Sequence, residues 1–179
     1  RPAPAKRTRF DVGVVVEELV RMFDVARPEG VDLEVEVGRN LVVLADSTQV
    51  RQILWNLLLN AVQAMPDGGR IQISVADAGP EPQEGASEDR NEPKGEGGFV
   101  EVMVADTGVG IAPEVMERIF DPFFTTRQVD EGTGLGLTVS DSIVASHGGT
   151  LELESTPGEG SRFRIYLPML SPDLNGESA

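Results

Sequence analysis

Apolar residues recur at intervals of three and four between Asp46 and Met65, which is the spacing of one face of an α-helix. The stripe consists of Val50, Ile53, Leu54, Leu57, Leu58, Ala61, Val62 and Met65. Asp46 followed by Gln49 has the pattern of a helix N-cap, and Pro66 with the glycines after it marks the end. The pattern predicts a helix over 46–65 that buries its apolar face in a core.

Three carboxamide side chains follow one edge of this stripe. Gln52, Asn56 and Asn60 are spaced four residues apart, so they share one face of the predicted helix. Asn disfavours helix interiors because its amide competes for backbone partners, so two on one face need a reason. One interpretation is a solvated polar edge. The other is that Asn56 and Asn60 present amide oxygens to a hard cation such as Mg²⁺ at the rim of a pocket.

The rest of the chain shows alternating and helical periods. The predicted strands cover 31–37, 41–45, 71–75, 99–105, 151–153 and 163–167. The predicted helices cover 11–27, 46–65, 113–120 and 134–147. We expect the first two strands to form a hairpin. Because helices and antiparallel-looking strands alternate without regular strand–helix–strand units, the pattern indicates an α+β fold, a mixed sheet with helices on one face.

Composition indicates one domain, residues 10–168, with irregular stretches around it. Residues 1–9 are basic, contain proline and lack a period, which is typical of a linker. Residues 77–98 carry almost no apolar side chains, so we expect a long disordered loop inserted between neighbouring strands, with an acidic docking loop as the alternative. Residues 169–179 have the pattern of a frayed tail.

Charge and composition exclude several classes of function. The 179 residues include 15 basic and 30 acidic side chains, a formal charge of −15, which argues against binding nucleic acid or anionic lipid. There is no cysteine and only one histidine, so a disulfide, a thiolate zinc site and a histidine-rich metal site are excluded. No apolar run approaches the roughly 20 residues that cross a bilayer, so we expect no membrane contact by this domain. Any metal must be held by oxygen.

Two glycine-rich motifs carry the candidate chemistry. The run DTGVGI follows a predicted buried strand, which would deliver the carboxylate of Asp106 to the edge of the sheet. The run GTGLGL, residues 132–137, opens a helix, so its backbone N–H groups can point at phosphate oxygens. It is no Walker loop, because no Lys-Ser/Thr pair follows. Asp106 could cap a turn, or it could accept the exocyclic amino group of adenine.

The motifs NLLLNAVQA, DTGVGI, FDPFFTT, GTGLGL, HGG and GEGSRFRIYLP occur in an order that resembles the catalytic ATP-binding domain of sensor histidine kinases, in the GHKL superfamily. They are similar to its N, G1, F and G2 boxes, and DPFFTT with HGG is similar to the nitrogen-regulation type. The likeness spans about residues 10–168. It implies a two-layer α/β sandwich of the Bergerat type, with ATP held between helices under a mobile lid, here residues 121–133.

The resemblance also implies roles for individual residues. Asn60 would be the principal Mg²⁺ ligand and Asn56 would assist it, and Asp106 would bind the adenine amino group. Arg127, where many relatives have a lid lysine, would contact the γ-phosphate. The implied catalytic residues are thus Asn56, Asn60 and Arg127. The implied nucleotide-binding positions are Asn60, Asp106, Gly108, Gly110, Thr133, Gly134, Leu135, Gly136 and Ser161.

Two details bear on the reaction. By the same resemblance, hydrolytic relatives such as gyrase, mismatch-repair and chaperone ATPases have a glutamate base where this chain has Asn56. An amide cannot take a proton from water, so we expect the site to hold ATP for transfer. Nothing resembles the helical phosphoacceptor motif, in which His precedes Glu or Asp and a later Pro. His147 lies in the HGG turn at a helix C-terminus, where we interpret it as structural.

The resemblance therefore implies a chain that binds Mg-ATP and phosphorylates a histidine on an adjacent dimerisation and phosphoacceptor domain, which then serves a response regulator. The whole protein would be a homodimer with this domain on the cytoplasmic side, and the sequence leaves its membrane anchoring open. Two alternatives also remain open. One is a GHKL-type ATPase or serine kinase, and the other is a nucleotide-sensing module without transfer activity.

Overall fold

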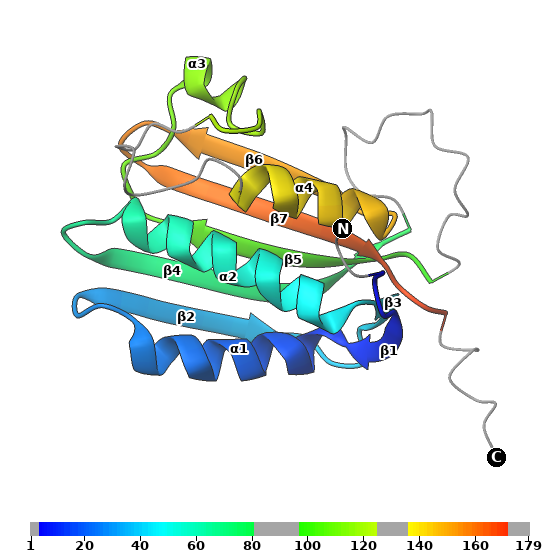
Figure 1. Ribbon diagram of the computed structural model, residues 1–179. Helices are drawn as coiled ribbons and strands as arrows, with labels where there is room; N and C mark the ends of the chain where they lie inside the picture. The colour runs from blue at the N-terminus through cyan, green and yellow to red at the C-terminus, as the bar shows by residue number, and fades with distance from the viewer. Residues whose placement is uncertain (1–3, 81–96, 125–135, 172–179) are drawn as a thin grey trace.

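The computed structural model describes residues 4–80, 97–124 and 136–171, and Figure 1 shows the order of its elements. The helices are α1 (Val12–Ala26), α2 (Ser47–Gln63), α3 (Pro113–Met116) and α4 (Gly136–Ser146). The strands are β1 (Thr8–Asp11), β2 (Val31–Val37), β3 (Val42–Ala45), β4 (Gly69–Gly79), β5 (Phe99–Asp106), β6 (Thr150–Thr156) and β7 (Gly160–Pro168).

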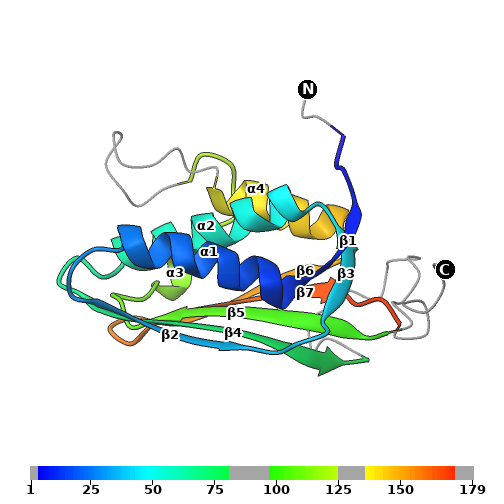
Figure 2. The same cartoon turned by 90° about the horizontal axis from the view of Figure 1, so that it is seen from below.

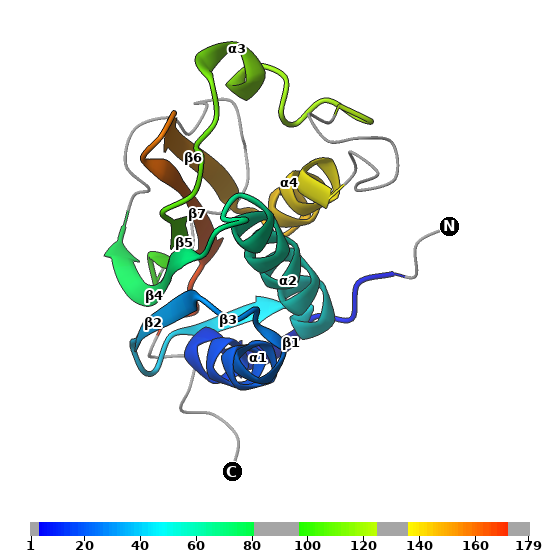
Figure 3. The ribbon, with the colours of Figure 1, turned by 90° about the vertical axis from the view of Figure 1, so that its left-hand side faces the viewer.

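Two layers make up the fold. Helices α1, α2 and α4 cover one face of a five-stranded sheet with the order β2-β4-β5-β7-β6, as Figures 2 and 3 show from two directions. The β2–β4 pair is parallel and the other pairs of this sheet are antiparallel. The predicted α+β class, with a mixed sheet and helices on one face, is confirmed. No helix among the described residues is long and apolar enough to cross a membrane.

The core lies between the helices and the inward face of the sheet. The predicted stripe of α2 is buried along its length, except that Val62 is only half-buried. The inward strand positions alternate as the period-2 pattern predicts, through Ile71, Ile73 and Val75 in β4 and Val100, Val102 and Val104 in β5. Trp55, on the side of α2 toward α1, packs edge-to-face on Phe23 with ring centroids 6.0 Å apart.

The predicted hairpin of the first two strands is wrong. Strand β2 pairs with β4, and β3 pairs with β1 in a separate two-stranded sheet. The chain leaves the main sheet between them. The Gly38 N–H donates to the Val75 carbonyl of β4 at 2.8 Å, and three residues later the Leu41 carbonyl accepts from Val12 at the start of α1 at 3.0 Å. An alternating pattern shows which strands exist, but it does not show which strand pairs with which.

Both predicted irregular ends contain paired residues. Thr8 and Arg9 lie in β1, where Thr8 is opposite Ala45, although composition indicated a linker through residue 9. At the other end, the Met169 N–H donates to Gly98 O at 2.9 Å and the Leu170 N–H donates to Val42 O at 2.8 Å. These bonds tie β3 to the main sheet. The predicted insertion over 77–98 does join two neighbouring strands, because β4 and β5 are paired. Its predicted start is wrong, since Asp77–Gly79 belong to β4, and residues 81–96 lie outside the described part.

Candidate functional site

Asp106 ends β5 with a buried carboxylate. Its residue is 9% exposed, and its Oδ1 accepts the backbone N–H of Gly108 at 2.9 Å. Burial raises the pKa of the Asp106 carboxyl above its ordinary value, and backbone hydrogen bonds from Gly108 and Ser161 only partly oppose this. A carboxylate in so enclosed a place is a strong acceptor for a ligand N–H group.

Gly108 fits between Asp106 and the end of α2. A Cβ at this position would lie 2.5 Å from the carbonyl oxygen of Ala64, the C-cap residue of α2, and 2.8 Å from Asp106 Oδ1. The next residue, Val109, donates its N–H to the same Ala64 carbonyl at 3.0 Å. The loop after β5 is therefore fastened directly to the C-terminal end of α2.

Gly110 brings the same loop against the turn between β6 and β7. Its φ is +72°, and a Cβ there would overlap the carbonyl oxygen of Thr156. The Val109 carbonyl accepts from the Gly158 N–H in this turn at 2.8 Å. Gly110 therefore meets both reasons for a glycine, a left-handed backbone and a close approach.

Ser161 lies across from Asp106 in the β5–β7 pair and is buried. Its hydroxyl is 2.8 Å from that of Ser155, which also accepts the Ile111 N–H at 2.8 Å and donates to the Gly160 carbonyl at 3.0 Å. The Ser155–Ser161 pair thus holds the end of the DTGVGI loop next to Asp106.

The carboxamide face of α2 connects the two glycine-rich motifs. Asn56 and Asn60 are half-buried, and Ala64 follows at the same four-residue spacing. At the upstream end, a Cβ on Gly136, the first residue of α4, would lie 3.8 Å from Asn56 Nδ2. At the downstream end, Ala64 contacts Gly108. Asn60 lies between Asn56 and Ala64 on one helix face.

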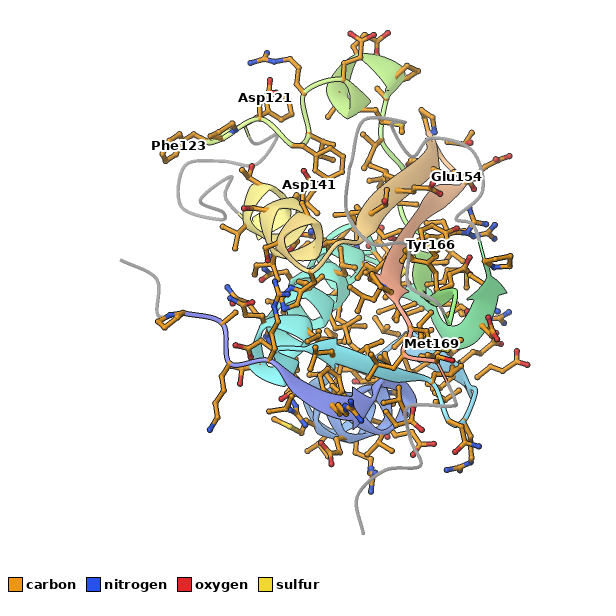
Figure 4. The ribbon with its side chains drawn as sticks, turned by 90° about the vertical axis from the view of Figure 1, so that its right-hand side faces the viewer. Asp121, Phe123, Asp141, Glu154, Tyr166 and Met169 are labelled. Carbon is orange, nitrogen blue, oxygen red and sulfur yellow. The ribbon has the colours of Figure 1, made fainter. Side chains whose placement is uncertain are left out.

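The FDPFF stretch, residues 120–124, is hydrogen-bonded to α4. Thr138 in the first turn of α4 donates its hydroxyl to the Phe120 carbonyl at 2.8 Å. The guanidinium of Arg118 lies 4.6 Å from the ring centroid of Phe124. Phe123 has a φ of +65° and is 74% exposed, and Figure 4 places it at the outer end of this stretch. The predicted helix over 113–120 is limited to α3.

The structure brings the described candidate residues together around the C-terminal half of α2. They are Asn56, Asn60, Asp106, Gly108, Gly110, Gly136 and Ser161. The candidates Arg127, Thr133, Gly134 and Leu135 lie outside the described residues, as does most of the predicted lid. Within the described part, no group of three or more His, Cys, Asp or Glu side chains is placed to hold a metal ion. A surface hollow at the ends of β2 and β4, between Glu36 and Asp77, shares no residue with this set.

Sequence reasoning missed two residues that build the site. Ala64 fastens the Asp106 loop, and the four-residue spacing that marked Asn56 and Asn60 would have reached it. Ser155 organises the loop through its hydroxyl, and no sequence signal distinguishes it from an ordinary strand serine.

Comparisons with known proteins agree with this geometry. Residues 45–171 match the family described as histidine kinase-, DNA gyrase B-, and HSP90-like ATPase. The chain is 39% identical over 157 residues to the sensor kinase CckA of Brucella abortus, which covers 86% of this chain and 16% of CckA. It is 35% identical over 171 residues to the sensor histidine kinase ZraS of Klebsiella oxytoca, which covers 94% of this chain and 33% of ZraS. The chain spans a third or less of the length of these relatives.

Solved structures show the same fold. The catalytic domain of histidine kinase ThkA has a TM-score of 0.74 at 30% identity, covering 92% of this chain and 97% of that chain. Full-length ShkA in complex with AMPPNP has a TM-score of 0.73 at 25% identity, covering 96% of this chain and 33% of that chain. Histidine kinase ThkA in complex with response regulator TrrA has a TM-score of 0.68 at 28% identity, covering 90% of this chain and 41% of that chain. The unit described here therefore corresponds to nearly all of one catalytic domain and to a part of two longer proteins.

Proposed function

The chain belongs to the family of histidine kinase-, DNA gyrase B-, and HSP90-like ATPases and is a histidine kinase catalytic domain, and from this premise we propose that it binds ATP with Mg²⁺ and transfers the γ-phosphoryl group to a histidine of an adjacent phosphoacceptor domain. ATP binding is the property that the family description itself implies. The magnesium ion, the individual site residues and the histidine acceptor are the proposed parts.

The buried carboxylate of Asp106 carries this proposal. One of its oxygens is held by the Gly108 N–H, and the neighbouring loop is fixed by Ala64 on one side and by Thr156 on the other. A carboxylate fixed in this way can accept the exocyclic amino N–H of adenine, and it would repel the carbonyl oxygen that guanine has at that position. Discrimination of about 1–3 kcal/mol is expected from such a buried, directional contact. Ser161 beside it supplies a hydroxyl for a further contact to the base.

The carboxamide face of α2 supports the metal and phosphate part of the proposal. Asn60 would be the principal Mg²⁺ ligand through its amide oxygen and Asn56 would assist, because hard cations prefer oxygen ligands. The nucleotide supplies the phosphoryl group, and the ion supplies positive charge that offsets the phosphates in a chain of formal charge −15. Gly136 leaves room beside Asn56 for the phosphates at the N-terminal end of α4, where backbone N–H groups and the helix dipole favour anions. Arg127, Thr133, Gly134 and Leu135 are proposed to complete the phosphate site.

The proposed partners follow from the relatives. The ShkA structure contains AMPPNP, and the ThkA structure contains the response regulator TrrA. We accordingly propose that the present chain works within a longer homodimeric protein on the cytoplasmic side, with its own phosphoacceptor domain and a response regulator as partners. Asn56 favours transfer over hydrolysis, because an amide cannot act as the base that activates water.

A two-step experiment tests the proposal. Calorimetry on the folded chain is expected to show binding of ATP that weakens strongly when Mg²⁺ is removed with a chelator. Mixing the chain with its separately expressed phosphoacceptor domain and γ-labelled ATP is then expected to give an acid-labile, alkali-stable phosphate on histidine. Label on serine, or release of phosphate to water alone, would instead identify the serine kinase or ATPase alternative. The absence of any heat with Mg-ATP would refute the nucleotide site itself.

A further inference from the structure

His147 joins the end of α4 to the beginning of α2. Its Nε2 lies 3.1 Å from the backbone nitrogen of Asp46, the N-cap residue of α2, and its Nδ1 lies 2.8 Å from the carbonyl oxygen of Ile143 in α4. The residue is 8% exposed. Figure 1 shows both helix ends on the same side of the molecule, opposite the N-terminal end of α4.

The two partners fix the state of the imidazole. The Ile143 carbonyl can only accept, so Nδ1 must carry the hydrogen, and the Asp46 N–H can only donate, so Nε2 must be the bare acceptor. The two contacts therefore fit a single tautomer of the buried ring, with its hydrogen on Nδ1. Each of its two nitrogens makes a contact with a different helix. An apolar side chain in place of the ring would leave the part-buried Asp46 N–H without this acceptor, while the Ile143 carbonyl would keep its bond from the His147 backbone N–H.

The hydrogen bond from the Asp46 N–H to His147 takes the place of a bond that Gln49 could have accepted within α2. At many helix starts, the N-cap N–H is bonded by the side chain three residues later, which here is Gln49. Asp46 Oδ1 does accept from the N–H groups of Thr48 and Gln49, at 3.0 and 3.3 Å. Gln49 Oε1, however, is buried without a hydrogen-bond partner in the described part of the chain, while the Asp46 N–H donates to His147. A bond that could have stayed within α2 is thus made between two helices.

The N-terminal segment is fastened at the same point. The Lys6 N–H donates to Asp46 Oδ2 at 2.9 Å, and the Arg7 guanidinium donates to the Ser146 carbonyl, one residue before His147, at 2.6 Å. The bonds of Lys6 and Arg7 reach the two helix ends that His147 connects. The segment just before β1, the N-cap of α2 and the last turn of α4 therefore form one hydrogen-bonded junction.

The geometry of α4 gives this junction an effect at a distance. The helix has eleven residues and is about 16 Å long, so a tilt of about 10° about its His147 end would move Gly136 by about 3 Å. Gly136 faces Asn56, since a Cβ at Gly136 would lie 3.8 Å from its side-chain amide, and Asn56 is proposed to help hold the metal. A displacement of this size is large compared with the tolerance of a phosphate and metal site.

We propose that His147 is a positioning residue, which bonds the Asp46 N–H to fix α4 across α2 and thereby holds Gly136 beside Asn56. This inference rests on the proposed function for its effect on nucleotide binding. Its structural half is that the placement of Gly136 beside Asn56 depends on the imidazole at the other end of α4, and this half stands on the hydrogen bonds and the length of α4.

Two variants separate the bond between His147 and Asp46 from the bond between His147 and Ile143. In His147→Gln, the side-chain amide oxygen can reach the place of Nε2 and accept the Asp46 N–H. In His147→Asn, the shorter amide can donate to the Ile143 carbonyl in place of Nδ1 but cannot reach Asp46. The dissociation constant of Mg-ATP is measured by calorimetry at a temperature where circular dichroism shows both variants folded. It is expected to rise about tenfold in H147N and to stay within about twofold of the wild type in H147Q.

A purely structural role predicts a different result. In that case H147N melts at a lower temperature than H147Q, but the two bind Mg-ATP equally well while folded, and this outcome overturns the inference. Equal weakening in both variants overturns it too, because the acceptor for Asp46 would then not be the determinant.

A second measurement needs no nucleotide. The side-chain amide resonance of Asn56 in a ¹⁵N spectrum of the apo protein is expected to shift in H147N and to remain in place in H147Q. If the wild type binds no Mg-ATP, the proposed function fails, and this spectrum alone decides the inference. An unmoved Asn56 signal in both variants would overturn it.

Discussion

The carbonyl oxygen of Ala64 occupies the space that a side chain on Gly108 would need, since a Cβ there would lie only 2.5 Å from it. The other close neighbours of that Cβ are the Ala64 side chain at 2.7 Å and Asp106 Oδ1 at 2.8 Å, so the clash cannot be relieved by one flexible atom. Gly108→Ala is therefore expected to push the loop away from α2 and to lower the free energy of unfolding by about 1–3 kcal/mol. Urea denaturation followed by circular dichroism measures this directly.

Gly136→Ala is the matched control for this substitution. A Cβ at Gly136 would meet Asn56 at 3.8 Å, an ordinary van der Waals distance, and alanine is favoured over glycine in a helix. Its unfolding midpoint should equal or exceed that of the wild type. If G108A is as stable as G136A, then the loop after β5 is not held against Ala64.

Asp106→Asn tests the recognition of adenine. The amide oxygen of Asn can still accept the Gly108 N–H, and the substitution removes a buried charge, so the apo protein should melt within a few degrees of the wild type. The NH₂ group of Asn cannot accept the adenine amino group, so the affinity for Mg-ATP should fall by about 10- to 100-fold. Calorimetry with ATP and GTP measures both the loss and the change in preference between the two. A collapse of the apo fold would show that Asp106 serves structure alone.

Tyr166 gives the chain a defined sensitivity to alkali. Its hydroxyl donates to Glu101 Oε2 at 3.0 Å on the polar face of the sheet, and burial together with this carboxylate raises the pKa of Tyr166 to about 12. Because the folded pKa lies above the ordinary value near 10, the stabilisation is complete below pH 10 and is lost as the pH rises toward 12. Two pKa units correspond to at most about 3 kcal/mol.

Tyr166→Phe is the comparison for this pH dependence. The variant lacks the titrating hydroxyl, so the stability gap between wild type and Y166F should shrink between pH 10 and pH 12 and be constant between pH 7 and pH 9. Urea midpoints at a series of pH values measure the gap. A gap that does not change above pH 10 would mean that Tyr166 ionises in the folded chain as easily as in the unfolded chain.

Most elements of this fold could be predicted from the sequence, but β1 and the pairing of the strands could not. The stripe of α2 and the alternation in β4 are local patterns, and burial of one face enforces them. The pairing of β3 with β1 depends on where the chain crosses between Gly38 and Leu41, and on hydrogen bonds between residues far apart in the sequence. A four-residue strand such as β1 has too few positions to show a period.

The candidate site, too, could be predicted where its residues are neighbours in the sequence and could not where they are far apart. Asp106, Gly108 and Gly110 stand in a contiguous motif, and such a motif can be found without a structure. The role of His147 was foreseen only as structural, because its partner Asp46 lies 101 residues away and the contact uses a backbone N–H that no sequence pattern marks. Backbone groups such as the Ala64 carbonyl also shape the site, and they have no signature in the sequence.

Asn56→Glu tests why this chain would transfer phosphate rather than hydrolyse ATP. Asn56 lies on the site face of α2 and faces Gly136, so a longer carboxylate at this position is expected to reach the proposed phosphate site and to take a proton from water. ATP hydrolysis without any acceptor is expected to rise at least about tenfold, since general-base catalysis contributes about 10²–10⁴-fold when well placed. Labelled phosphate release measures it. Asn56→Gln has the same length without the base and should show no such rise. If the two variants hydrolyse ATP equally, the missing carboxylate is not what limits hydrolysis in the wild type. The site would then exclude the attacking water by other means.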